Sequence, residues 1–454
     1  MTRLSFYDPL FETIDFEKEL YLIDPMQQLF SFNPKQIFER LLHTYEMSRL
    51  LFLHQAGLNF LVFPSATHNR FTHCLGCWLL GTYALESVKV HYSGLKVERS
   101  LKRWLYGNGK LLEFLLALLL HDCGHGPFSH VLENNPDLDY SHEDITAQFI
   151  RGEGKYYKIL KERVSSEETI DSVLSEYKNI DIEFITGLVA YPFEKFKEKW
   201  GSLVSLKDLV DSSIDLDRLD HYLRDSRFMG IKFGEFNILA LLENIIIYPE
   251  EKVKYIRIRE EGVPHVLNLL YSKELIWMIA FDSPEVRAYE SMLNKAVSIA
   301  VKTGELKADE IPLLSEDELL YRLKICQNGT VRTLLKRLLS REPYLFVCSC
   351  RVPADILRED IDIKIEEIMK KAGFEEEDLL VYIPFKEKPK QPVPWLKLYT
   401  EDGSELSEKH PGFNIAIWEK EKQIRRTIKF FAKDKKVKEK AEWMIRKSDF
   451  FKVV

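Results

Sequence analysis

Four residues that lie far apart in the chain have side chains suited to binding a metal ion: His73, the adjacent pair His121 and Asp122, and Asp217. Two imidazoles and two carboxylates form a mixed nitrogen and oxygen ligand set, which suits Mn, Fe, Co, Ni, Zn or Mg. A metal ion held in this way lowers the pKa of bound water from about 15.7 to roughly 7. The sequence therefore predicts a divalent metal site at which water becomes a nucleophile near neutral pH.

Other polar residues near these four suit chemistry on a phosphate. Arg70 lies one helical turn before His73, and a guanidinium contacts phosphate oxygens in a bidentate way. His125 and His130 follow His121 on a glycine-rich turn, from which both imidazoles could face the metal. Histidines beside a phosphate serve as general acids and stabilise developing negative charge. Two further carboxylates near Asp217, those of Asp215 and Asp220, are alternative ligands, and Asp215 also suits a capping role.

Three sequence blocks carry these residues: HNRFTH (68–73), HDCGHGPFSH (121–130) and DLDRLDHYLRD (215–225). In this order they resemble the HD-domain metal-dependent phosphohydrolases, and most closely the deoxynucleotide triphosphohydrolase branch of that family. The resemblance extends over about residues 8–293. It implies that His73, His121, Asp122 and Asp217 hold the metal, with Asp217 preferred because it aligns with the family's ligand.

The same resemblance implies roles for the catalytic group. It assigns His125 and His142 to catalysis and places His130 along the phosphate pocket. Glu143 follows His142, as in the family, and would orient a catalytic imidazole. Glu133 stands where the family often has an aspartate, so the carboxylate is kept.

Substrate contacts are also implied by the resemblance. Arg70, Arg218 and Lys273 would bind the phosphates. The sugar contacts would be Gln55, at the 3′-hydroxyl, together with Asp225 and Phe281. Two positions depart from the family: Ala56 replaces a leucine that helps exclude a 2′-hydroxyl, and His221 replaces the tyrosine that packs under the sugar. Both changes open the question of deoxyribose selectivity.

Composition sets limits on the class of protein. The chain has 454 residues, 45% of them hydrophobic, and a formal net charge of −7, which argues against a broad nucleic-acid-binding surface. No apolar signal region is evident near the start, and the longest apolar stretch, around residues 111–120, is too short to span a bilayer. Six cysteines in such a chain indicate reduced thiols and a cytoplasmic location. Among them, Cys74 and Cys77 are expected to be core residues.

Hydrophobic periodicity predicts a mainly α protein, with a helical part over 1–313 and a small α+β C-terminal module over 314–454. The resemblance implies that the helical part has an HD-domain core. Short strands are expected within 1–30, a hairpin-like pair within 244–258, and a mobile loop at 386–394. Helices are predicted at 71–90, 101–121, 142–150 with Ser141 as N-cap, 206–228, 266–303, 360–372 and 435–447. In the C-terminal module, strands are predicted at 345–350, 379–384 and 395–400.

The residues themselves predict metal-assisted hydrolysis of a phosphoester. The resemblance implies the substrate and products: (deoxy)nucleoside triphosphates hydrolysed to nucleoside and inorganic triphosphate. Two alternatives remain open: an HD phosphohydrolase of nucleoside monophosphates or cyclic nucleotides, and a non-catalytic nucleotide-binding regulator. The resemblance further implies a homo-oligomer. It does not support activation by a guanine nucleotide, because His43, Ser48 and Leu51 do not keep the residue types expected at such a site.

Overall fold

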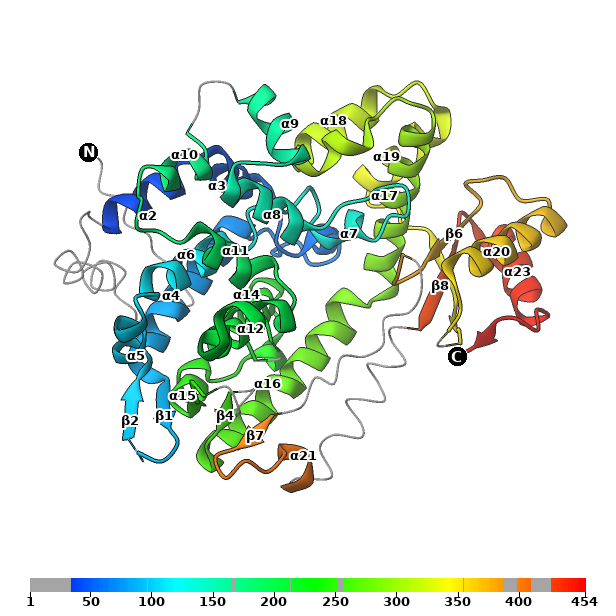
Figure 1. Cartoon of the computed structure of the whole chain (residues 1–454). Coiled ribbons are helices and arrows are strands. Elements are labelled where there is room, and N and C mark those ends of the chain that lie inside the picture. The colour runs from blue at the N-terminus through cyan, green and yellow to red at the C-terminus, as the bar shows by residue number, and fades with distance from the viewer. Residues whose placement is uncertain are drawn as a thin grey trace.

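A computed structural model describes residues 34–95, 97–164, 168–212, 214–250, 256–353, 355–386, 398–409 and 426–454. The described chain is mainly helical, as predicted, with two small sheets (Figure 1). None of the described helices combines the length and apolar composition needed to cross a bilayer. The strands expected within 1–30, and the expected loop at 386–394 apart from Lys386, lie outside the described residues.

Most of the helices form one body, which we call the helical body. Its centre is formed by α4 (Arg70–Ser87) and α6 (Leu111–Leu120). Every residue of α6 is buried, which agrees with its almost continuous apolar sequence. The single helix predicted over 101–121 is wrong, because α5 (Leu101–Asn108) ends before α6 begins. Gly109 adopts a left-handed conformation (φ 66°) at the end of α5, and this conformation terminates the helix.

The helix predicted over 206–228 is likewise divided, into α13 (Val204–Val210) and α14 (Leu216–Met229). Asp215 caps the start of α14, where its side chain accepts a hydrogen bond from the backbone N–H of Arg218 at 2.7 Å. The helix predicted at 142–150 is confirmed as α8 (His142–Arg151), and Ser141 is its N-cap as expected.

The remaining helices surround this centre. In chain order they are α2 (Pro34–Leu42), α3 (Tyr45–Arg49), α7 (His130–Glu133), α9 (Lys155–Arg163), α10 (Ile170–Ser175), α11 (Ile182–Ala190), α12 (Phe193–Trp200), α15 (Ile238–Glu243), α16 (Val263–Ile276), α17 (Pro284–Lys302), α18 (Glu316–Ile325), α19 (Gly329–Leu339) and α21 (Leu406–Lys409). A π-helix, η7 (Trp277–Phe281), interrupts the helix predicted over 266–303, so α16 and α17 are separate. Single π turns often occur at functional sites.

One sheet lies at the edge of the helical body, in the order β2-β1-β3-β4-β7. Its strands are β1 (Lys89–Tyr92), β2 (Val97–Ser100), β3 (Ile245–Ile247), β4 (Arg257–Ile258) and β7 (Tyr399–Thr400). The antiparallel pairing of β3 with β4 confirms the hairpin-like pair predicted within 244–258. The helix predicted over 71–90 ends at Ser87, because β1 starts at Lys89 and pairs with both β2 and β3.

A second sheet forms a lobe beside α17 at the right of Figure 1, in the order β6-β8-β5-β9. It consists of β5 (Leu345–Arg351), β6 (Leu379–Tyr382), β8 (Thr427–Ala432) and β9 (Lys452–Val453), with α20 (Arg358–Ala372) and α23 (Lys435–Arg446) beside it. This lobe has an apolar core of its own. We use the name C-terminal module for this lobe, which starts with β5 and is therefore smaller than the module predicted over 314–454.

The strand predicted at 395–400 does not belong to this second sheet. Its described part, β7, pairs in parallel with β4 of the helical body. Apolar side chains of α18 and α19 also lie in the core of the helical body. The domain boundary near residue 313 therefore stays a proposal, and the separate apolar core starts with β5.

Candidate active site

Three helices bring the predicted metal ligands to one place. His73 lies in the first turn of α4, whose N-cap Asn69 accepts a hydrogen bond from the N–H of Thr72 at 3.0 Å. His121 is the residue that ends α6, and Asp122 follows it directly. Asp217 lies in the first turn of α14, just after the cap at Asp215. Helix ends therefore carry all four side chains.

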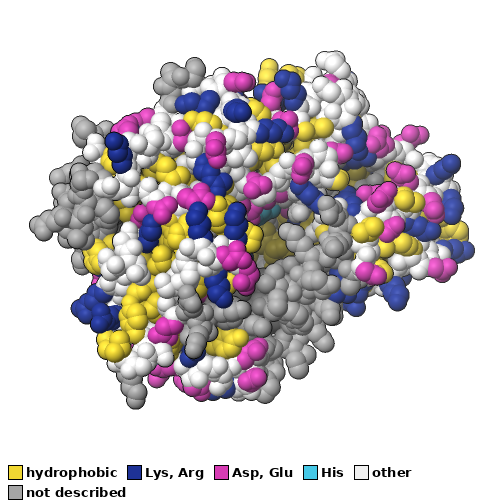
Figure 2. Space-filling view, viewed as in Figure 1, with side chains coloured by type: hydrophobic (Ala, Val, Ile, Leu, Met, Phe, Trp, Pro, Cys, Tyr) yellow, Lys and Arg dark blue, Asp and Glu magenta, His cyan; other side chains and the backbone are white. Residues whose placement is uncertain are grey.

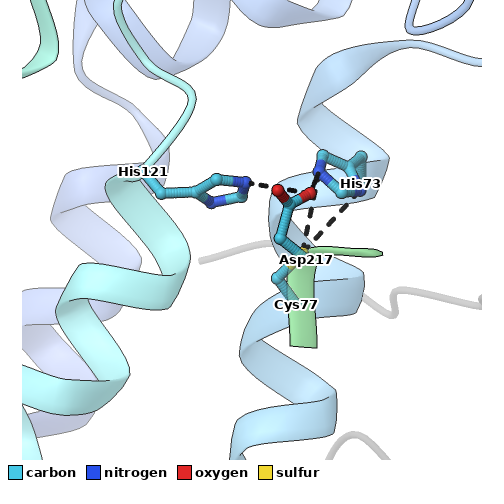
Figure 3. A group of neighbouring side chains, drawn as sticks. All are labelled: His73, Cys77, His121 and Asp217. Atoms are coloured by element: carbon cyan, nitrogen blue, oxygen red, sulfur yellow. Dashed lines mark hydrogen bonds and ion pairs between the residues drawn. The ribbon is translucent and has the colours of Figure 1, made fainter. Parts of the chain in front are cut away.

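The distances show how closely these four side chains converge. The Nε2 atom of His73 lies 3.0 Å from Oδ1 of Asp217 and 3.5 Å from Oδ2 of Asp122. The Nε2 atom of His121 lies 3.7 Å from the same Asp217 oxygen and 3.5 Å from Oδ1 of Asp122. Figure 3 shows the Asp217 carboxylate between the two imidazoles. Ligands bound to one metal ion at about 2.0–2.2 Å are separated by similar distances.

The hydrogen bonds on the far side of each imidazole fit the same role. The Nδ1 atom of His121 donates to the carbonyl oxygen of Leu118 at 2.9 Å, which leaves Nε2 as the acceptor atom. That Nε2 atom is buried and has no hydrogen-bond partner among the described residues. The Nδ1 atom of His73 contacts Oδ2 of Asp220 at 2.7 Å. A carbonyl or carboxylate behind the imidazole is the usual support of a metal-binding histidine, so the residues present fit a divalent ion.

Asp220, considered above as an alternative ligand, lies behind His73 rather than beside Asp217. Its carboxylate also accepts two hydrogen bonds from Arg224, each at 2.8 Å. Gly76 makes this arrangement possible, because a Cβ atom there would lie 1.9 Å from Oδ1 of Asp220. The carboxylate of Asp220 is thus occupied in orienting the imidazole.

Cys74 and Cys77 are buried on α4, in agreement with the expectation of core residues. Cys77 is nevertheless part of the metal-binding geometry. Its sulfur lies 3.7 Å from Nε2 of His73, and its position with His73, His121 and Asp217 would allow a shared ion. Burial raises the pKa of the Cys77 thiol far above its usual value, so the thiol is neutral. The thiolate ligand that metals prefer is therefore disfavoured at this position.

The two carboxylates of this group are strongly anionic. Burial alone would raise the pKa of Asp122, but the adjacent Arg70 guanidinium lowers it well below its usual value. Burial likewise opposes ionisation of Asp217, yet the adjacent imidazoles of His121 and His73 lower its pKa well below 3.8. Arg70, expected at a phosphate, donates here to Asp122 and, at 2.8 Å, to the hydroxyl of Ser129.

A second cluster next to the first contains His125, His130, Glu133 and His142. Glu133 lies behind two of the imidazoles, with Oε1 at 2.7 Å from Nδ1 of His142 and Oε2 at 2.6 Å from Nδ1 of His130. The rings of His125 and His142 stack with their centroids 3.8 Å apart. A histidine side chain is visible in a hollow near the middle of the face shown in Figure 2.

Two imidazoles of the second cluster, those of His125 and His142, differ in their protonation. Burial and the Arg70 guanidinium lower the pKa of His125 well below 6.5. Burial also disfavours the charged form of His142, but Glu133 overcomes this effect and raises its pKa to about 9. Because Nδ1 of His142 contacts Glu133, its Nε2–H is the proton that can be donated to a substrate. His125 lies beside it, with Nε2 at 3.4 Å from Oδ1 of Asp122.

Glu143, expected to orient a catalytic imidazole, is half exposed at 51% and lies 3.6 Å from Nδ1 of His142. Its carboxylate accepts a hydrogen bond from the hydroxyl of Ser141 instead. Glu133 occupies the closer position, with contacts to both the ring and the backbone N–H of His142. The geometry therefore favours Glu133 over Glu143 for this role.

The residues expected around the sugar also lie together. Nε2 of Gln55 is 3.5 Å from Nδ1 of His221, and the same ring atom lies 3.0 Å from Oδ2 of Asp225. The rings of His221 and Phe281 have centroids 5.7 Å apart, and Phe281 packs against the small apolar cluster that contains Ala56. Contacts thus connect Gln55, Ala56, His221, Asp225 and Phe281, and we call this group the nucleoside wall after the role that the sequence predicts for it.

The two remaining expected phosphate contacts lie on neighbouring helices. Arg218 follows Asp217 on α14, and its guanidinium contacts the capping carboxylate of Asp215. Lys273 is buried on α16, in the last turn before the π-helix. The structure thus assigns Arg218 a local ion pair, and Lys273 lies next to the segment that carries Phe281.

Several supporting residues were not predicted from the sequence. Glu316 accepts hydrogen bonds from the backbone N–H groups of His54 and Phe128, and Ser129 joins Arg70 to the carbonyl of His54. Arg49 donates to the carbonyl of His125 at 2.6 Å. Ser129 stands inside the HDCGHGPFSH block and could have been found there. The other side chains reach the site from distant segments without any local motif.

Comparisons with known proteins indicate which proteins this chain is similar to. The family model of the HD domain matches residues 70–224. The chain is 26% identical over 350 residues to the uncharacterized protein YwfO of Bacillus subtilis (strain 168), covering 71% of each. It is 25% identical over 384 residues to the deoxynucleoside triphosphate triphosphohydrolase SAMHD1 homolog of Dictyostelium discoideum, covering 80% of this chain and 68% of the relative.

A vertebrate relative is matched over a smaller share of its length. Deoxynucleoside triphosphate triphosphohydrolase SAMHD1 of Bos taurus is 24% identical over 308 residues, and the match covers 63% of this chain and 47% of that protein. The chain thus aligns with about half the length of this vertebrate protein. A crystal structure of a hypothetical protein from Aquifex aeolicus has the same fold, with a TM-score of 0.62, 21% identity, and coverage of 90% of this chain and 95% of that one.

Proposed function

We propose that this chain, which is a metal-dependent phosphohydrolase with an HD domain, hydrolyses (deoxy)nucleoside triphosphates to nucleoside and inorganic triphosphate. The names of the Dictyostelium and vertebrate relatives support the substrate class. The single observation that carries the proposal is the adjacency of the two clusters. Carboxylates and imidazole Nε2 atoms suited to a cation lie next to a protonated imidazole suited to a leaving oxygen.

A divalent ion bound by His73, His121, Asp122 and Asp217 would lower the pKa of water and polarise a phosphoryl oxygen. Mn, Mg, Fe, Co, Ni and Zn all remain candidates, because the donor set suits borderline and hard ions. The ligand atoms come from three helices, so their positions depend on the packing of α4, α6 and α14.

In the proposed reaction a water oxygen forms a bond to the α-phosphorus, and the bond between that phosphorus and the 5′-oxygen breaks. His142 would donate its Nε2 proton to the departing 5′-oxygen, while Glu133 stabilises the imidazolium from the Nδ1 side. His130 and His125 would line the phosphate path beside it. Arg70, Arg218 and Lys273 would neutralise the triphosphate, since charge-assisted hydrogen bonds from guanidinium and ammonium groups to phosphate oxygens are strong.

The nucleoside wall would hold the sugar and base. Gln55, His221 and Asp225 supply the polar atoms, and Ala56 and Phe281 supply the apolar surface. Ala56 is small, so a 2′-hydroxyl has more room here than beside a leucine. We therefore expect ribonucleotides to be accepted better than in a strictly deoxyribose-selective enzyme. We also propose that the chain assembles into a homo-oligomer, as expected from its family.

The test is turnover of a panel of dNTPs and NTPs with Mn, Mg, Co or Ni, with products separated by chromatography and His121→Ala as the inactive comparison. Release of one inorganic triphosphate per nucleoside, lost in the variant, would support the proposal. Release of orthophosphate, or turnover only of monophosphates or cyclic nucleotides, would favour the alternative phosphohydrolase. Binding of nucleotide without any turnover in the presence of bound metal would favour a regulator.

A further inference from the structure

A buried group of charges joins the C-terminal module to the helical body. Lys429 of β8 contacts the carboxylate of Asp282, and Arg287 donates to Oε2 of Glu290 at 2.6 Å. Nε of Arg287 also lies 3.6 Å from Oδ1 of Asp282. Lys429, Arg287 and Glu290 are buried, so each charge depends on its neighbours rather than on water.

Lys429 is on the side of β8 that faces the helical body. Ile428, Phe430 and Ala432 belong to the apolar core of the C-terminal module, whereas Phe431 belongs to the core of the body. Because side chains alternate along a strand, Lys429 and Phe431 share the face directed at the body. A buried lysine on a strand face is unusual, and here its ammonium is aimed at one acidic group of the other core.

That acidic group lies at the end of the π-helix. Asp282 directly follows Phe281, the last residue of η7. Arg287 lies over the rings of Trp277, the first residue of η7, at 5.6 Å and of Tyr382 of β6 at 4.3 Å. Both ends of the π-helix are therefore contacted by the charged group.

Phe281 connects this junction to the nucleoside wall. Its ring lies 5.7 Å from that of His221 and packs against the cluster containing Ala56. The module also contacts the segment that connects α7 to α8, two helices that carry residues of the second cluster. In this segment the carbonyl of Leu138 accepts a hydrogen bond from Lys386 at 2.9 Å. The C-terminal module therefore contacts the segments that carry both sides of the candidate site.

We propose that Lys429 is a positioning residue that holds Phe281 in the nucleoside wall through Asp282, which makes the C-terminal module part of nucleoside selection. This inference rests on the proposed function, since it concerns the same pocket. Lys429 itself touches no expected substrate atom. Its effect is on the direction of Phe281, and thus on which nucleosides fit between Phe281 and His221.

The first test compares Lys429→Met with Lys433→Met. Lys433 lies just beyond the end of β8 and pairs with Glu377 and Asp378 inside the module, so its replacement also removes a lysine charge without touching Asp282. In Lys429→Met we expect KM for nucleotides to rise about 10- to 100-fold, as for a misplaced binding surface. The preference among bases should change, and the metal content and kcat should change little. Equal KM values and base preference in the two variants would overturn the proposal.

Two further variants separate positioning from loss of folding. Lys429→Arg keeps the charge and should keep KM near the wild-type value. Lys429→Met with Asp282→Asn removes both charges of the pair and should still show the altered base preference. If the double variant folds and keeps the original base preference, the proposal is wrong.

Hydrogen exchange of residues 277–283 provides a readout that does not need turnover. Faster exchange in Lys429→Met than in Lys433→Met would support the link between the module and the π-helix, and equal exchange would overturn it. If the wild-type protein hydrolyses no triphosphate, the proposed function fails, while this comparison still decides whether Lys429 holds the π-helix.

Discussion

The two polar clusters of the candidate site differ in where their carboxylates lie. Around His73 and His121, the carboxylates of Asp122 and Asp217 face the Nε2 atoms, so that negative charge and lone pairs point to one spot. Around His142, the carboxylate of Glu133 lies behind the ring at Nδ1. The first arrangement attracts a cation, and the second makes an imidazole more basic and leaves its other nitrogen for an anion.

This difference explains how histidines close together in the sequence can have opposite roles: one group binds a cation, and the other donates a proton to an anionic substrate. His121 and His125 are four residues apart, yet Nε2 of His121 faces the carboxylates of Asp122 and Asp217, while the cluster of His125 contains the protonated His142. His73 and His142 both have a carboxylate at Nδ1, so the roles are separated by the further carboxylates of Asp122 and Asp217, which face Nε2 of His73. Substitutions in either cluster test this division between a metal-binding cluster and a proton-donating cluster. They are given from the largest expected effect to the smallest.

The largest effect is expected for Asp217→Asn. Removing this anionic oxygen takes away a ligand that contacts both His73 and His121. Because even supporting residues of metal sites typically contribute 10- to 100-fold in affinity, we expect a loss of metal affinity of at least about 100-fold, with activity near background. Metal titration and turnover measure the two effects. Asp211→Asn is a matched control, since Asp211 is an exposed partner of Lys207. Equal metal affinity in both variants would contradict the ligand assignment.

His142→Gln should lower kcat while leaving metal binding intact. A general acid typically contributes about 10²- to 10⁴-fold, and the loss should fall in that range. Single-turnover kinetics at saturating metal measure the chemical step directly. His130→Gln should have a smaller effect, because its ring is 63% exposed. A His142→Gln variant with unchanged kcat would remove this residue from the catalytic step.

Glu133→Gln should move the alkaline limb of the pH profile. In the wild-type protein Glu133 raises the pKa of His142 to about 9, so the acid form persists up to that pH and is lost above it. Without this carboxylate, burial lowers the pKa of His142, and the limb should shift toward or below 6.5.

Glu143→Gln is the control for that experiment, because Glu143 is half exposed and farther from the ring. Its limb should stay near the wild-type position. A larger shift in Glu143→Gln than in Glu133→Gln would reverse the assignment of the two carboxylates. The raised pKa of His142 also contributes to folding stability below about pH 6.5, and this contribution should disappear as the pH rises through about 9.

The smallest effect on chemistry, though a clear one on stability, is expected for Gly76→Ala. The added Cβ would overlap Asp220, so α4 and α14 must separate. Such overpacking typically costs about 1–3 kcal/mol of the free energy of unfolding. Gly107→Ala on α5 meets no atom within 4 Å and should stabilise the helix by about 0.5–1 kcal/mol. Denaturant unfolding measures the change in the free energy of unfolding of both variants. Equal changes in the two variants would contradict the close packing of Gly76 against Asp220.

Local motifs predicted much of this molecule. The blocks around His73, His121 and Asp217 indicated which residues to look for, and these residues lie together. The sequence did not indicate that Glu133 would be closer than Glu143 to His142. The path of the segment between α7 and α8 places His142 beside Glu133, and no local pattern in the sequence predicts that path. Nor did it show that β7 pairs with β4, since strand partners far apart in the chain leave no local pattern.

The central claim is that the cluster around His73 and His121 binds a cation and the cluster around Glu133 does not. It is tested most directly by the metal content per chain of the wild type, Asp217→Asn and His142→Gln. Each protein is dialysed with Mn²⁺ and analysed by elemental mass spectrometry. The account predicts one ion per chain in the wild type and in His142→Gln, and none in Asp217→Asn. Loss of an ion in His142→Gln would contradict it, because the histidines around Glu133 would then bind a cation themselves.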